Sequence, residues 1–175
     1  MALPLKLSPY SEKRTKNTAG KEKTAFYPKG LKEGGKRRRE HLRGMCFFLF
    51  GGVCYVLLEL CWRQYSHWTM FLCGGLCFFL SDILNNSAPL RRSPLWICCF
   101  AGASVITAVE FICGCIVNLW AHWDVWDYSG YRANLLGQIC LYHSVLWFFL
   151  SAPILWISRR MRRDFENVWK KLTPH

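Results

Sequence analysis

The stretch VEFICGCIVNLWAHWDVWDYSGYRANLLGQICLYHSVLW, from Val109 to Trp147, decides the fold of this chain. It joins two long apolar runs through a short loop rich in Trp, Asp and Tyr, and it places a carboxylate, Glu110, deep in the first run. An ionisable side chain in hydrocarbon costs at least ~2.5–3.5 kcal/mol, so such a residue is usually functional or paired. The stretch therefore indicates a small polytopic membrane protein with a polar feature among its helices.

Four apolar segments, each near the length that spans a bilayer, follow one another along the chain. They cover residues 44–62, 68–84, 95–120 and 135–158. The fold class that we expect is all-α, a bundle of four transmembrane helices. Residues 1–43 form a basic tail of low apolar content, which predicts disorder, and residues 159–175 form an amphipathic basic tail.

The basic residues are distributed so that one side of a membrane can hold almost all of them. The chain has 23 Lys and Arg and a net charge of +12, yet only Arg63 and Arg132 lie outside the two tails and the loop at Arg91 and Arg92. The positive-inside rule then places both termini in the cytoplasm. The same distribution argues against nucleic acid as a partner and predicts anionic lipid of the bilayer at the basic tails.

Several chemistries have no support in the sequence. All ten cysteines lie in the apolar runs, where they are expected as small packing residues rather than as a disulfide framework. His122, Asp124 and Asp127 match no strong metal-ligand spacing, and the chain has no G-x-x-x-x-G-K-[ST] loop for ATP. We therefore expect no enzyme activity, no metal and no cofactor.

Polar residues at helical spacing define a candidate polar interior. Glu110, Gly114 and Asn118 share one stripe of the third segment. A contact between Glu110 and His143 on the next, antiparallel segment is sterically conceivable, because both are expected ~13–15 Å below the outer surface. Gln138 and His143 would point about 140° apart on one helix, so one of them could face a second subunit. The candidate set is Glu59, Glu110, Gly114, Asn118, Gln138 and His143.

Two interpretations of this set remain open. The residues could line an outward-opening cavity, with Gly52 and Gly114 allowing close approach, or they could simply form hydrogen bonds between helices. Asp82, at the inner end of the second segment, is expected only to reach the interface. Asp127 is expected to accept bonds from backbone donors or Arg132 and to position the start of the fourth helix.

Several motifs resemble one family of integral membrane proteins over residues 44–158. They are LELCWRQYSHWTMFLCGGLCFFL from Leu58 to Leu80, VEFICGCIVNLW, VWDYSGYRANLLGQICL and the later Trp147. Together they resemble the putative ABC-transporter type IV family, small and mostly bacterial proteins described as ABC transporter permeases. The matching loop residues are Arg63, His67, Trp68, Trp126, Asp127, Tyr128, Ser129, Asn134 and Gly137.

The resemblance implies a transport-related protein of the cell membrane, and three interpretations compete. A transport subunit predicts an outward-opening polar cavity between helices. A non-transporting scaffold or regulatory subunit predicts a closed bundle whose polar groups are bonded internally. An intramembrane enzyme has the least support. Because four helices leave little room for a path and the chain lacks an ATP site, we expect a homo-oligomer or a separate ATPase or membrane subunit as partner.

Overall fold

The structure is a computed structural model and describes residues 29–173, with side chains from Gly34 onward. The chain divides after Arg38 into two compact units, and the description below concerns the second, from Arg39. The predicted disorder of residues 1–28 lies outside the described part of the chain.

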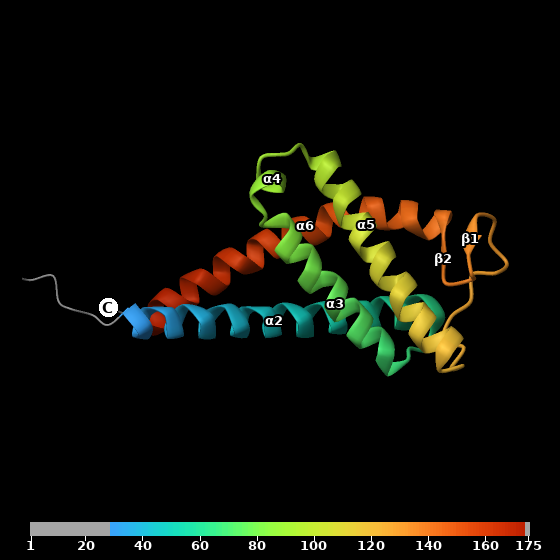
Figure 1. The fold of residues 1–175 in the computed structure, drawn as a ribbon, viewed down its shortest axis with the longest axis horizontal. Coiled ribbons are helices and arrows are strands. Elements are labelled where there is room, and N and C mark those ends of the chain that lie inside the picture. The colour runs from blue at the N-terminus through green and yellow to red at the C-terminus, as the bar shows by residue number, and fades with distance from the viewer. Residues whose placement is uncertain (1–28, 174–175) are drawn as a thin grey trace, which may run out of the picture. The chain divides into compact units, whose positions relative to one another are not determined.

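Four long helices account for most of the described residues, as the all-α prediction required (Figure 1). They are α2 (Lys29–Arg63), α3 (Trp68–Asn85), α5 (Leu95–Gly114) with its continuation η1 (Cys115–Trp120), and α6 (Leu141–Leu172). A single-turn helix, α4 (Ala88–Arg91), joins α3 to α5. Each of the four long helices has the length and apolar composition to cross a membrane, so the predicted four-helix membrane fold is confirmed.

The first and last long helices, α2 and α6, extend beyond the apolar segments predicted for them. The helix α2 begins at Lys29, so the end of the tail predicted to be disordered is helical. The helix α6 runs without a break through Pro153 into the basic tail. Adding residues to an existing helix needs no new nucleation, which explains why the polar flanks join the spans. Arg39 and Arg43 of α2 both pair with Glu166 of α6, at 3.0 and 3.8 Å.

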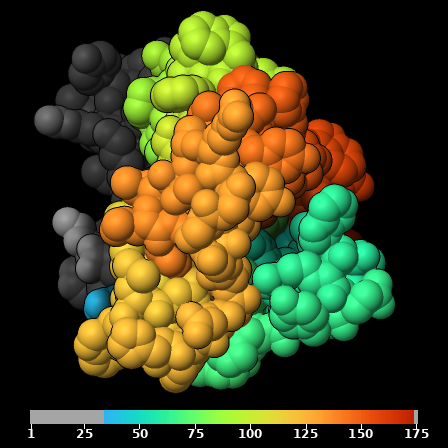
Figure 2. Space-filling view, turned by 90° about the vertical axis from the view of Figure 1, so that its right-hand side faces the viewer, coloured from blue at the N-terminus to red at the C-terminus, as the bar shows by residue number. Residues whose placement is uncertain are grey.

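The fourth span begins six residues later than the apolar pattern predicts. Residues 134–140 form a small antiparallel hairpin, β1 (Asn134–Leu135) with β2 (Ile139–Cys140), in which Asn134 faces Cys140. Gly137 provides the turn with a φ of +68°, which glycine adopts without strain. The prediction that residue 135 starts the helix was therefore wrong. Figure 2 looks onto this end and shows the loop and hairpin, in yellow and orange, spread across it.

Close backbone approach holds α2 against α3. A Cβ added at Gly52 would lie 2.7 Å from the carbonyl oxygen of Phe71, and one at Gly75 would lie 2.7 Å from that of Phe48. Small residues at such interfaces let two membrane helices pack at short range. On the other side, α3 packs on α5 through a buried cluster of Cys73, Cys77, Ile106 and Val109, and Trp147 and Ile154 of α6 pack against this cluster. All ten cysteines are free thiols.

Candidate functional site

One buried carboxylate joins three of the spanning helices. Glu110 of α5 is 3% exposed and accepts hydrogen bonds from two neutral donors. The Trp147 indole N–H of α6 donates to its Oε2 at 2.6 Å, and the Tyr55 hydroxyl of α2 donates to its Oε1 at 3.4 Å. The Tyr55 and Trp147 rings also stack, with centroids 6.1 Å apart. We call Tyr55, Glu110 and Trp147 the Glu110 clasp.

His143 is not the partner of Glu110. Because α6 starts at Leu141, His143 lies in its first turn, and the residue that reaches Glu110 is Trp147, one turn further along. The His143 Nδ1 lies 3.0 Å from the Cys140 thiol, and its ring stacks on Tyr128 with centroids 4.3 Å apart. The expected orientation of Gln138 relative to His143 on one helix also fails, since Gln138 belongs to the hairpin rather than to α6.

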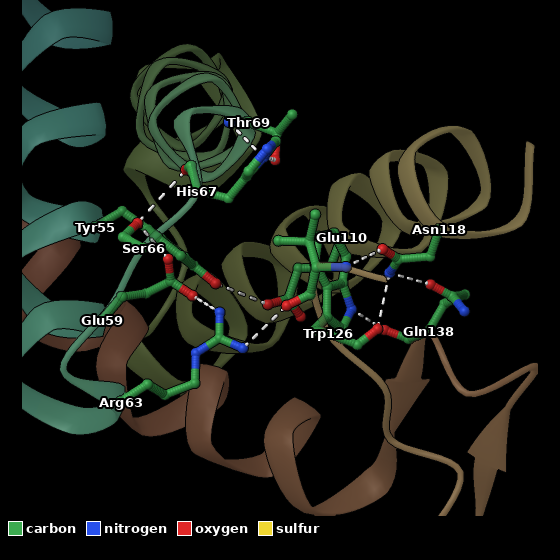
Figure 3. Close-up of polar contacts among 11 residues, drawn as sticks. Tyr55, Glu59, Arg63, Ser66, His67, Thr69, Glu110, Asn118, Trp126 and Gln138 are labelled. Atoms are coloured by element: carbon green, nitrogen blue, oxygen red, sulfur yellow. Dashed lines mark hydrogen bonds and ion pairs between the residues drawn. The ribbon is translucent and has the colours of Figure 1, made fainter. Parts of the chain in front are cut away.

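Near the C-terminal end of α2, the Glu59 carboxylate is held by an arginine and by a hydroxyl group. Arg63, one turn later, pairs with Glu59, and the Ser66 hydroxyl donates to Glu59 Oε2 at 2.6 Å. The Arg63 guanidinium also donates to the Val125 carbonyl oxygen at 3.3 Å. The loop after η1 is thereby attached to the end of α2 (Figure 3).

Asn118 fixes the same loop from the other side. Its amide nitrogen donates to the Trp126 carbonyl at 2.9 Å and to Gln138 Oε1 at 2.8 Å, while its oxygen accepts from the Val125 N–H at 2.8 Å. The Trp126 indole N–H donates to the Gln138 carbonyl at 3.0 Å. Asn118, Gln138 and Trp126 are all buried. We call the connected residues Glu59, Arg63, Asn118, Val125, Trp126 and Gln138 the outer network (Figure 3).

A glycine and a wide helical turn allow this close contact. A Cβ added at Gly114 would lie 2.9 Å from Gln138 Cβ and 3.1 Å from Trp126, so only glycine leaves them room. Asn118 lies in η1, where a π-helical turn widens the end of α5. Such turns are rare and often occur at functional sites. Gly52, by contrast, faces α3 rather than the outer network.

The loop motif is an ordered turn. Asp127 Oδ1 accepts from the Ser129 N–H at 2.8 Å and from the Ser129 hydroxyl at 2.6 Å, so its partner is Ser129 rather than Arg132. These two bonds hold the pKa of the Asp127 carboxyl below its usual value. The Asn134 amide donates to the carbonyls of Ser129 and Tyr131, and its oxygen accepts from the Gly137 N–H at 3.1 Å.

The remaining motif residues lie around this loop. His67 caps α3, with its Nδ1 2.8 Å from the Thr69 hydroxyl. Trp68 is the first residue of α3 and is largely exposed, with its ring 5.6 Å from that of Trp123. The Tyr128 N–H donates to the Gly137 carbonyl at 2.7 Å, and burial raises the pKa of its phenol.

Asp82 is a buried ion-pair partner, which corrects the prediction that it simply reaches the interface. It is 4% exposed, pairs with Arg162 of α6 and accepts from the Ser158 hydroxyl at 2.7 Å. The sequence signal was present: Arg162 follows Ser158 by four residues, so one face of α6 carries both side chains toward Asp82 at the end of α3. Burial of a charged carboxylate is costly unless it is paired and hydrogen-bonded, and both conditions hold for Asp82.

The arrangement satisfies its own polar groups. In the part of the chain that the structure describes, the buried side-chain atoms without a hydrogen-bond partner belong to Arg39, Ser81 and Ser87, none of which lies in the clasp or the outer network. Within the same residues, no group of His, Cys, Asp and Glu is placed to hold a metal ion. The residues that sequence reasoning missed are Ser66 and Val125, together with the bonding roles of Tyr55 and Trp147.

Comparison with known proteins gives one match. A family model described as putative ABC-transporter type IV matches residues 38–174, which is most of the chain. No curated protein and no solved structure matches it.

Proposed function

The chain belongs to the putative ABC-transporter type IV family. We propose that it is a non-translocating membrane subunit of a transport-related assembly. Its role in this proposal is that of a scaffold or regulatory subunit of the cell membrane, as opposed to the substrate path. The proposal assigns any ATP hydrolysis to a separate ATPase subunit, since residues 1–175 contain no G-x-x-x-x-G-K-[ST] loop.

The observation that carries the proposal is the closure of the polar interior. A path for a polar substrate needs side chains that exchange their partners with water and substrate. In the outer network, Asn118 satisfies both its amide oxygen and its nitrogen with the loop and Gln138. Glu59 is likewise occupied by Arg63 and Ser66. These bonds favour a fixed support for the loop.

The Glu110 clasp supports the same role from inside the bundle. Its two bonds join α2, α5 and α6 at one carboxylate, so a rocking motion of any one helix against the others would break a buried hydrogen bond. A buried group left without its partner costs ~1–3 kcal/mol. The clasp therefore opposes the helix movements that alternating access requires.

One observation favours a second function, in which this chain itself conducts protons. Among the ion pairs of the described residues, none includes Glu110, so its carboxyl has only neutral partners. Carboxyl groups inside membranes often serve in proton relays. In this alternative, Glu110 would exchange a proton with the outer network.

Proton flux through the purified chain separates the two functions. The protein is reconstituted alone into liposomes that contain a pH-sensitive dye, and a proton gradient is imposed. We expect no flux above that of protein-free liposomes, either for the native chain or for Glu110→Gln. A flux that disappears in Glu110→Gln, with unchanged insertion and thermal stability, would establish the second function and contradict the first.

A further inference from the structure

A pocket rich in arginine lies where α3 ends, beside α4 and the middle of α6. It has a volume of about 430 Å³, and its lining includes Arg91 of α4 together with Arg159, Arg162 and Arg163 of α6. Its single acidic residue is Asp82. We propose that this arginine pocket binds the phosphate headgroup of an anionic membrane lipid.

The charges of the pocket do not cancel. The Arg162 guanidinium pairs with the Asp82 carboxylate through its Nη2 and its Nε. Arg159 donates only to a neutral group, the Asn85 side-chain oxygen, at 3.2 and 2.9 Å. Among the ion pairs of the described residues, none includes Arg91, Arg159 or Arg163. Three guanidinium groups in one pocket therefore remain available to an anion.

The pocket is built on buried supports. Asp82, Asn85 and Ser158 are at most 5% exposed. Asp82 pairs with Arg162, the Asn85 oxygen accepts from Arg159, and the Ser158 hydroxyl donates to Asp82. The Asn85 amide nitrogen donates to the Leu155 carbonyl, which orients its oxygen toward Arg159. Arg159, held in this way, loses little side-chain freedom on binding, so more of its interaction energy is kept as affinity.

Phosphate is the anion that fits these donors, and the membrane is its source. A guanidinium presents parallel N–H donors that match two phosphate oxygens, which a point charge such as Lys does not. Trp156, 66% exposed, lies on the pocket wall, and exposed tryptophan is typical of the headgroup level of a bilayer. Basic pockets between membrane helices are known to hold lipid headgroups.

The test compares two double variants that remove equal charge. Arg91→Gln with Arg163→Gln empties the pocket of two free guanidinium groups and leaves the Asp82–Arg162 pair intact. Arg92→Gln with Arg160→Gln changes the neighbouring positions, of which Arg160 pairs with Asp164 and neither lines the pocket. Binding of fluorescent phosphatidic acid is measured for the full chain in phosphatidylcholine nanodiscs, with thermal unfolding as the check on folding.

We expect about tenfold or greater weakening for Arg91→Gln with Arg163→Gln, because hydrogen bonds to charged groups are lost, and near-native binding for the control pair. Equal losses in the two pairs would mean that the basic surface attracts lipid diffusely, and native binding in both would mean that the pocket holds none; either result overturns the proposal. Inorganic phosphate is added as a competitor. Complete displacement of the lipid by inorganic phosphate would point to a soluble anion and also overturn the lipid assignment.

Discussion

At the scale of single residues, the Asn118 side chain makes three hydrogen bonds that its position in an apolar segment did not predict. Its side chain bonds to two backbone groups of the loop and to Gln138, all within a buried region. The loop residues Val125 and Trp126 have no regular secondary structure there, so their backbone groups depend on these bonds. Asn118 thus replaces the bonding that a strand or helix would supply.

We predict that Asn118→Ala lowers the free energy of unfolding by ~1–3 kcal/mol, because it leaves the Val125 N–H buried without an acceptor. Equilibrium unfolding in detergent measures the change. The control is Ser104→Ala on α5, which removes a hydroxyl that bonds only to the Phe100 carbonyl of its own helix on an exposed face. Equal stability of the two variants would show that the outer network does not hold the loop.

Asp127 gives a prediction for pH. Since its pKa is lowered in the folded protein, its contribution to stability is present above the unfolded value of ~3.9 and is lost as pH falls through the folded value. Ser129→Ala removes the hydroxyl bond and should raise the Asp127 pKa toward the ordinary value. Carboxyl chemical shifts followed by NMR through an acid titration measure it. An unchanged pKa in Ser129→Ala would show that the Ser129 hydroxyl does not lower the Asp127 pKa.

At the scale of elements, the apolar pattern predicted the spans well and the hairpin not at all. Leu135 and Leu136 are as apolar as the residues of a spanning helix, and the first turn residue after them is Gly137. The hairpin forms because Gly137 accepts a positive φ, because the Gln138 carbonyl accepts from the Trp126 indole N–H, and because the Asn134 amide donates to the Tyr131 carbonyl. Contacts distant in sequence decide this element, so local periodicity could not reveal it.

The sequence indicated several polar residues of the candidate site but not their pairings. Position in an apolar run gives the depth of Glu110 along its span but not the side chains that it meets, and the structure buries it at 3% exposure. Whether Trp147 or His143 reaches Glu110 depends on where α6 begins. Because α6 begins six residues later than predicted, each of its side chains differs from the prediction in depth and in direction around the helix. The bonds of Asp82 escaped prediction because they join α3 to the distant tail of α6.

The glycines of α2 and α3 give a prediction at this scale. Gly52→Ala should lower the melting temperature, because its Cβ would meet the Phe71 backbone carbonyl, which cannot rotate away; overpacking of this kind costs ~1–3 kcal/mol. The control is Gly35→Ala, where an added Cβ meets nothing within 4 Å and helix propensity alone improves. A melting temperature in Gly52→Ala as high as in Gly35→Ala would contradict the close approach of α2 and α3.

At the scale of the whole molecule, the second unit has two polar layers separated by an apolar core. One end carries the outer network, and the other carries the arginine pocket with its Asp82–Arg162 pair. The buried cluster of Cys73, Cys77, Ile106 and Val109 lies with α3 and α5 between them. The placement of both termini in the cytoplasm stays a prediction from the distribution of basic residues, which also places the arginine pocket at the inner face.

The proposed function requires a closed interior beneath the loop, and native Cys140 reports directly on whether that interior is accessible. Cys140 is 2% exposed and lies two residues after Gln138, under the loop. The measurement is the rate at which a membrane-impermeant maleimide labels the chain in nanodiscs when Cys140 is the one cysteine retained. The reference is Trp123→Cys in a cysteine-free background, at a half-exposed loop position. We predict that the Trp123→Cys variant labels readily while Cys140 stays unlabelled until the protein is unfolded. Labelling of both at the same rate would show that the interior beneath the loop is open to water and would contradict the proposed function.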